Sequence, residues 1–231
     1  MKLYIGYDVV EDEAYQVAEQ SARAHGCQHV EPLNEDKLRS QGLFTRMVDK
    51  RGQKYDLPSN APCSTDFATS RFLTPILCQS GWAMFTDCDV VFHANPEDIL
   101  AVANPHYAVM VVKHYHNATG KKMVNMAQVP YIRKNWSSVM LFNCDHPSNR
   151  RLSLWDVNNR PGRDLHQFYW LNDNEIGELG QEWNWLVNEQ KPPASAKISH
   201  YTNGGPWLEG WQGADYDDEW IEARDKYLIH G

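Results

Sequence analysis

The sequence predicts an α/β fold, in which a mixed and mainly parallel Rossmann-like sheet is flanked by helices. Short apolar runs, such as Trp82 to Phe85 and Tyr107 to Val112, have the length and composition of buried strands. Segments with helical spacing or helix caps separate these runs, and this alternation is typical of parallel sheets. The chain has 231 residues and contains no repeat, low-complexity tract or linker, so we expect residues 1–231 to form one domain.

The strands and helices are expected to alternate along the whole chain. Apolar runs predict strands over residues 2–7, 29–33, 82–86, 107–112, 137–142, 183–186 and 197–201. Helical spacing or polar caps predict helices over residues 11–24, 34–40, 64–79, 95–98, 147–155, 163–171 and 216–229. Ser64 and Asp66 are candidate caps, Pro75 is expected to kink its helix, and Pro96 occupies the favoured first helical position.

Two polar and basic stretches, residues 42–61 and 113–133, are expected to be long irregular loops. Long loops in compact domains are often functional. We expect both loops to flank a ligand site and to become ordered when the ligand binds.

A pair of aspartates follows the most clearly buried strand. Asp87 and Asp89 come directly after Thr86, and the apolar residues from Val90 to Phe92 follow them. Ligands of open α/β sheets collect at the carboxyl ends of strands. Mg²⁺ and Mn²⁺ take oxygen ligands and often share their shell with substrate phosphates. The pair is therefore a candidate site for a cation that clamps a diphosphate; the alternative is two solvated loop acids.

Composition excludes several classes of protein. The formal net charge of −8 argues against general nucleic-acid binding, which needs a basic face. The chain shows no charged-then-apolar leader and no apolar run near the roughly 18 residues of a membrane span, so a cytoplasmic location is expected. The five cysteines are widely spread without a Cys-x-x-Cys pair, which favours reduced thiols over a zinc site or disulfides.

Six short blocks occur in an order that resembles a known family. They are Gly6-Tyr7-Asp8, Ser70 to Pro75, Phe85 to Val90, Ser138 to Asn143, Asp173 to Ile176 and His200 to Trp207. In this order the chain resembles glycosyltransferases with the A-type nucleotide-sugar fold, closest to family 8, which includes glycogenin and bacterial galactosyltransferases. The resemblance spans nearly the full chain.

This resemblance implies a retaining transfer of a hexose from a UDP-sugar to a carbohydrate or other hydroxyl acceptor, with Mn²⁺ or Mg²⁺ as cofactor. By the same resemblance, Asp87, Asp89 and His200 bind the metal. Gly6, Tyr7 and Asp8 hold the base and ribose, and Arg71 contacts the diphosphate or the sugar. Asp173 and Asn174 occupy the place of an Asp-Gln pair near the transferred sugar.

Each of these residues also has a structural interpretation. Asp8 is a candidate helix cap, Tyr7 a candidate core aromatic, and Arg71 a candidate partner in a surface salt bridge. Gly204 and Gly205 let backbone N–H groups approach phosphate oxygens, or they only form a tight turn. Asp173 and Asn174 are also compatible with a helix start.

Two departures from the family pattern concern the donor site. Gly205 stands where the family has a phosphate-contacting lysine, so Lys113, Arg71 and Lys121 are candidates to replace it. Trp136-Ser137-Ser138 replaces the usual Asn-Ser-Gly. A nucleotidyltransferase and a non-catalytic or degenerate nucleotide-sugar or carbohydrate-binding protein are therefore alternative functions.

Overall fold

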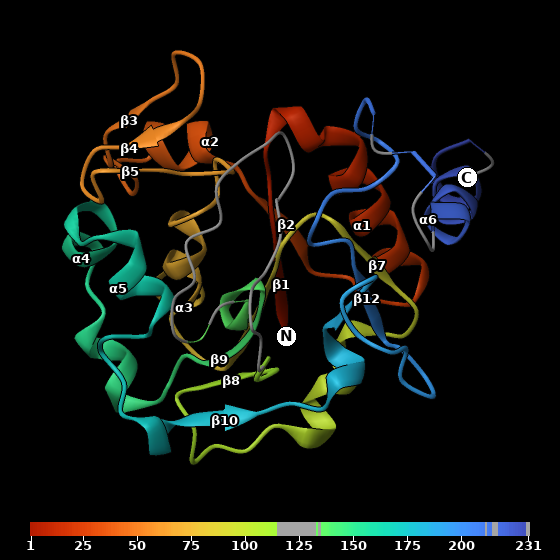
Figure 1. Cartoon of the computed structure of the whole chain (residues 1–231). Helices are drawn as coiled ribbons and strands as arrows, with labels where there is room; N and C mark the ends of the chain where they lie inside the picture. Colours follow the sequence, from red (N-terminus) through yellow and green to blue (C-terminus); the bar gives the residue numbers. More distant parts are fainter. Residues whose placement is uncertain (115–132, 134, 211, 214–216, 230–231) are drawn as a thin grey trace.

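A computed structural model describes residues 1–114, 133, 135–210, 212–213 and 217–229 (Figure 1). Its strands are β1 (Lys2–Gly6), β2 (Val30–Leu33), β3 (Val48–Asp49), β4 (Tyr55–Asp56), β5 (Ala61–Pro62), β6 (Trp82–Thr86), β7 (Val90–Phe92), β8 (Val109–Val111), β9 (Val139–Asn143), β10 (Ile176–Glu178), β11 (Trp185–Leu186) and β12 (Ile198–His200). Its α-helices are α1 (Asp12–Ala24), α2 (Glu35–Ser40), α3 (Thr74–Cys78), α4 (Leu154–Asn159), α5 (Gly162–His166) and α6 (Asp217–Arg224).

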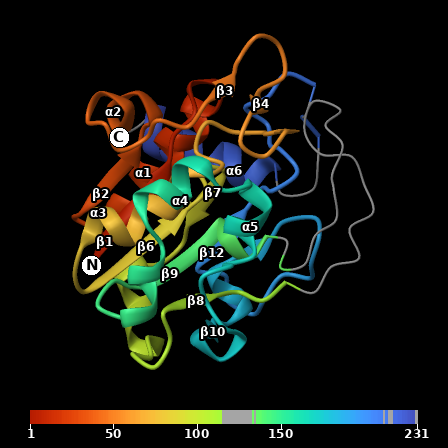
Figure 2. The same ribbon diagram turned by 90° about the vertical axis from the view of Figure 1, so that its left-hand side faces the viewer.

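The main sheet confirms the predicted α/β class. Within the described residues it has six strands in the order β10-β8-β9-β6-β1-β2. Strands β1, β2 and β6 are mutually parallel, and β9 is antiparallel to its neighbours β6 and β8. Helices α3, α4 and α5 lie on one side of this sheet and α1 and α6 on the other, as both views show (Figures 1 and 2).

Burial explains why the central strands have continuous apolar sequences. Every residue of β9, and every residue of β6 after Trp82, is buried. A strand covered by helices on both faces has no solvent side and therefore no alternation of polar residues. The carboxyl end of β6, where Asp87 follows, thus lies in the middle of the main sheet.

A second sheet brings a distant part of the chain to this point. Its order is β11-β12-β7, with β12 antiparallel to β7. The register places His200 opposite Val90, the residue directly after Asp89. A pairing between residues more than 100 positions apart therefore joins the predicted metal ligands.

The stretch 42–61 is not the irregular loop that we expected. Strands β3, β4 and β5 form a small antiparallel sheet there. Its two-residue strands are too short to show a periodic pattern. The fully buried Arg46 stabilises the sheet, because its guanidinium binds both carboxylate oxygens of Asp56 and the carbonyl oxygen of Val157.

Other differences concern short elements. The helix predicted over 64–79 is a 3₁₀ turn, Ser70–Leu73, followed by α3, and Pro75 lies in the first turn of α3 instead of kinking a longer helix. Strand β10 follows a 3₁₀ turn at Asp173–Glu175 and was not predicted. None of the helices in the described part of the chain has the length and apolar content that a membrane span requires.

Candidate metal centre

Three predicted ligands meet at the carboxyl end of β6. Asp87 and Asp89 lie in the turn between β6 and β7, and His200 ends β12. One ligand atom from each of the three residues lies within 4.8 Å of the others. The predicted Asp87-Asp89-His200 triad is therefore assembled by the fold.

The donor atoms of this triad fit a divalent cation. Nε2 of His200 lies 3.1 Å from Oδ1 of Asp89 and 3.9 Å from Oδ2 of Asp87. The His200 side chain is 1 % exposed, and the two carboxylates are 16 % and 13 % exposed. Two largely buried carboxylates need a nearby positive charge. Carboxylate oxygens suit Mg²⁺ and Mn²⁺, and the added imidazole favours Mn²⁺ of the two.

Arg71 belongs to the same centre. Its Nη1 lies 2.7 Å from Oδ1 of Asp87 and donates to the carbonyl oxygen of Ser137 at 2.9 Å. The residue is buried, and its guanidinium carbon lies 5.3 Å and 5.0 Å from the ring centres of Phe67 and Phe85. The salt-bridge interpretation is thus correct in part, but the bridge is buried and adjoins the triad.

The strand-one residues are engaged by other parts of the protein. Asp8 caps Val10 N–H, accepts from the backbone N–H of Asp66 at 2.9 Å, and forms an ion pair with Lys54. The Tyr7 hydroxyl donates to Oδ1 of Asp12 at 2.9 Å. The structure thus shows the capping interpretation of Asp8, and contact of either residue with a nucleotide stays a prediction.

Gly6 has a packing role that the sequence does not reveal. A Cβ atom at this position would lie 2.5 Å from the ring of Phe67. The absence of a side chain lets Phe67 pack directly on the end of β1, beside Arg71.

The Gly204-Gly205 segment forms a turn after His200. Gly204 has a φ of +114°, and its N–H donates to the carbonyl oxygen of Tyr201. A Cβ on Gly205 would lie 2.0 Å from the Trp207 ring, which packs on the buried Trp220 at 5.0 Å between ring centres. The turn interpretation accounts for both glycines, and phosphate binding by Gly204 and Gly205 stays a prediction.

Asp173 and Asn174 are not brought to the triad. They precede β10, whose first residue Ile176 pairs with Val109 of β8. Val109 and Ala83 both pair with Phe142 of β9, so Ile176 lies level with Ala83 near the start of β6. The metal centre lies at the other end of β6. The Asp173 side chain is 92 % exposed and pairs with Arg133. The expected helix start is present as the 3₁₀ turn Asp173–Glu175, which Asn172 caps, and contact of Asp173 or Asn174 with the transferred sugar stays a prediction.

Sequence reasoning also missed three buried groups beside the triad. The thiol of Cys88, between the two aspartates, donates to Oε2 of Glu11 at 3.3 Å. Burial, and next the charge of Asp89, raises the pKa of Glu11 to about 8. Asn184 contacts Nδ1 of His200 at 2.9 Å. Cys88 lies within the aspartate motif, but no motif marks Glu11 or Asn184, since only tertiary contacts bring these two residues to the site.

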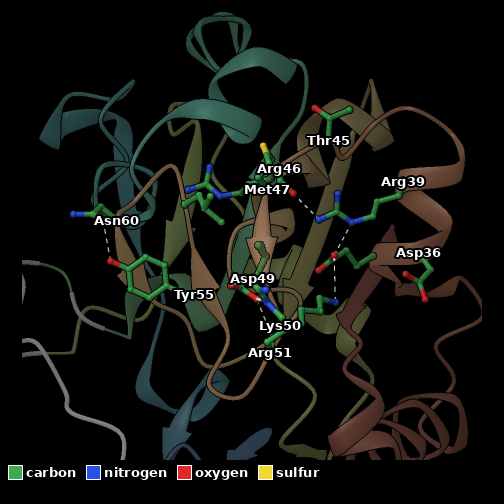
Figure 3. A pocket seen from close by; sticks show the side chains of 13 residues that line it. Asp36, Arg39, Thr45, Arg46, Met47, Asp49, Lys50, Arg51, Tyr55 and Asn60 are labelled. Carbon is green, nitrogen blue, oxygen red and sulfur yellow. Dashed lines mark hydrogen bonds and ion pairs between the residues drawn. The ribbon is translucent and has the colours of Figure 1, made fainter.

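Of the remaining basic candidates, only Lys113 belongs to the described residues. Nζ of Lys113 lies 5.6 Å from the centre of the Trp136 ring, and Lys121 is outside the described residues, as is most of the predicted loop 113–133. A pocket of about 840 Å³ lies between α2 and the small sheet (Figure 3). The basic side chains that line it are paired with acids, as Arg39 with Glu35 and Arg51 with Asp49.

This sheet, with an acid pair at the end of β6 and a histidine delivered by β12, has the A-type glycosyltransferase fold. Solved structures agree. The galactosyltransferase LgtC in complex with donor and acceptor sugar analogs superposes with a TM-score of 0.61, at 13 % identity, over 99 % of this chain and 96 % of LgtC. The glycosyltransferase GlyE of Streptococcus pneumoniae TIGR4 superposes with a TM-score of 0.59, at 11 % identity, over 96 % of this chain and 59 % of GlyE.

A curated relative shows the family. Protein CDI of Arabidopsis thaliana is 40 % identical over 235 residues, which cover 98 % of this chain and 86 % of the relative. The chain belongs to the family of Protein CDI. No family model matches the sequence.

Proposed function

We propose that this protein is a metal-dependent glycosyltransferase that moves a hexose from a UDP-sugar to a hydroxyl acceptor with retention. The observation that supports this best is the triad of Asp87, Asp89 and His200 at the carboxyl end of β6. In this fold that edge of the sheet is where ligands collect. The sugar analogs bound to LgtC support the substrate class by analogy of fold.

The residues of the chain have separate tasks in this mechanism. Asp87, Asp89 and His200 would hold Mn²⁺ or Mg²⁺, which supplies Lewis-acid stabilisation of the leaving diphosphate. Arg71 orients Asp87 through its 2.7 Å ion pair and adds a fixed positive charge. We assign no covalent nucleophile, so positioning and electrostatics account for the rate.

Replacement of the missing family lysine is part of the proposal. Gly205 precedes Pro206 and has no charge to offer. Arg71 already lies at the centre and is our preferred candidate for the diphosphate, because guanidinium geometry matches phosphate oxygens. We also place the reaction in the cytoplasm, because cysteines there are usually reduced. All five cysteines are free thiols: Cys27, Cys63, Cys78, Cys88 and Cys144.

A thermal-shift panel of UDP, GDP, CMP and ADP, each with and without Mn²⁺, tests the donor class first. A ligand at about 100 times its Kd stabilises the fold by roughly 2.7 kcal/mol, which gives a readable shift. We expect a Mn²⁺-dependent gain with UDP that Asp89→Ala abolishes. The exposed Asp98, outside the triad, supplies the matched control Asp98→Ala, which should keep the gain.

Product analysis then separates the possible functions. Release of free sugar from a UDP-sugar supports the transferase, and scanning several UDP-sugars identifies the hexose. Pyrophosphate release would instead indicate a nucleotidyltransferase. Binding without turnover would indicate a nucleotide-sugar-binding protein.

A further inference from the structure

We propose that Asn184 is a positioning residue of the metal centre, which holds His200 in the tautomer that presents Nε2 to the cation. This inference rests on the metal site of the proposed function. It adds a residue outside the six sequence blocks, on a different segment from every triad member.

Asn184 is fully buried and fixed at both its backbone and its side chain. It lies directly before β11, which pairs with β12 so that Leu186 is opposite His200. Its backbone N–H donates to the carbonyl oxygen of Gln181 at 3.1 Å. Its Oδ1 lies 2.9 Å from Nδ1 of His200. The strand pairing therefore delivers the ligand and its support together.

The orientation of the Asn184 amide follows from its other contacts. The Ser138 hydroxyl donates its single proton to the carbonyl oxygen of Asn135 at 2.7 Å. Oγ of Ser138 must then act as an acceptor toward Asn184, 2.9 Å away. The amide nitrogen of Asn184 consequently faces Ser138, and the amide oxygen faces His200. The reversed amide would place two acceptors in contact.

This polarity decides the state of the histidine ring. An amide oxygen accepts only, so Nδ1 of His200 carries a proton and donates it to Asn184. In the neutral ring the lone pair then lies on Nε2, which faces Asp89 at 3.1 Å. The backbone carbonyl oxygen of Asn135 therefore determines which nitrogen of His200 is free to bind a cation, acting through the side chains of Ser138 and Asn184. Such partners commonly fix the tautomer of metal-ligating histidines.

Removal of the amide would release this constraint. The ring is then free to place its proton on Nε2, where it donates to the nearby carboxylate of Asp89 and no longer binds a cation. Loss of this kind of partner typically lowers metal affinity by roughly 10- to 100-fold. Asn184→Asp keeps an oxygen acceptor for Nδ1–H, although its second oxygen faces Oγ of Ser138, so this variant should restore Mn²⁺ affinity while lowering Tm.

Isothermal titration of Mn²⁺ into the full chain, with UDP present, tests the proposal. We expect roughly 10- to 100-fold weaker Mn²⁺ binding in Asn184→Ala and recovery of most of that loss in Asn184→Asp. Asn149→Ala is the matched control, because Asn149 is also buried, donates to Ala108 and Asn143, and lies at the opposite end of β9. It should lower Tm without changing Mn²⁺ affinity.

Nitrogen-15 NMR of the metal-free wild-type ring, assigned with His200→Ala, provides a second readout that does not require any variant of Asn184 to fold. The proposal expects a protonated Nδ1. An Nδ1 lone pair, or equal Mn²⁺ affinity in wild type and Asn184→Ala, overturns it.

Failure of the proposed function gives a different result. If the wild type binds Mn²⁺ but releases no sugar from UDP-sugars, the activity is wrong while the comparison of Asn184 variants stands.

Discussion

The guanidinium of Arg71 and the carboxylate of Asp87 form a buried ion pair, with Nη1 2.7 Å from Oδ1. The same nitrogen donates to the carbonyl oxygen of Ser137, which precedes β9. This ion pair connects three segments: the 3₁₀ turn before α3, the turn between β6 and β7, and the residues just before β9. It leaves the second oxygen of Asp87 on the side of His200.

Truncation of Arg71 should therefore lower the stability of the protein. Arg71→Ala leaves the Asp87 carboxylate without its partner, and we expect a loss of about 3 kcal/mol in the free energy of unfolding. Urea unfolding without metal measures this loss. Arg51→Ala removes an exposed pair with Asp49 and should have no measurable effect. Equal effects of the two substitutions would contradict the burial argument.

Glu11 should make the metal-free protein less stable at high pH. Burial raises its pKa from 4.5 to about 8, with a further contribution from Asp89. Between these values the folded protein holds a proton that the unfolded chain has lost, so stability falls as the pH rises from about 5 to about 8. Glu11→Gln removes the ionisation, and its advantage over wild type should grow across this window.

Urea unfolding in a chelator at several pH values measures the effect of Glu11. The exposed Glu13, on the same segment, supplies the control Glu13→Gln. If the wild-type and Glu11→Gln stabilities run parallel from pH 5 to pH 8, Glu11 is ionised in the fold and the prediction is wrong.

Gly6→Ala should destabilise the protein through overpacking. The new Cβ would lie 2.5 Å from the Phe67 ring, which is held in the core next to Phe85. We expect a cost of about 1–3 kcal/mol. Gly180→Ala is the comparison, since its Cβ would meet only the end of the Glu182 side chain. Thermal unfolding should show the larger loss for Gly6→Ala, and a double variant with Phe67→Leu should recover part of it.

The small sheet β3-β4-β5 should be ordered before any ligand binds. Arg46 is fully buried and binds both oxygens of Asp56. Hydrogen exchange of the ligand-free protein should show protection at Leu57 N–H, which donates to Met47. Asp56→Asn should abolish this protection, because it leaves a buried guanidinium without its counter-charge. Rapid exchange in the wild type would restore our original expectation of a loop that orders on binding.

The central strands were predictable because burial on both faces leaves a continuous apolar run. This is why β1, β6 and β9 lie close to their predicted positions. The prediction of a helix over 64–79 was wrong and β10 was missed, because these segments lack such a pattern. Their residues have no strong periodicity, and contacts with neighbouring elements decide their conformation.

The fold class and the position of Asp87 and Asp89 could be predicted from the sequence, because a buried strand followed by two carboxylates is a local pattern. The positions of His200 and Asn184 beside these aspartates depend on contacts between distant segments. The pairing of β12 with β7 sets His200 opposite Val90, and the pairing of β11 with β12 sets Asn184 behind His200. Strand register depends on packing between distant segments, so no local pattern contains it.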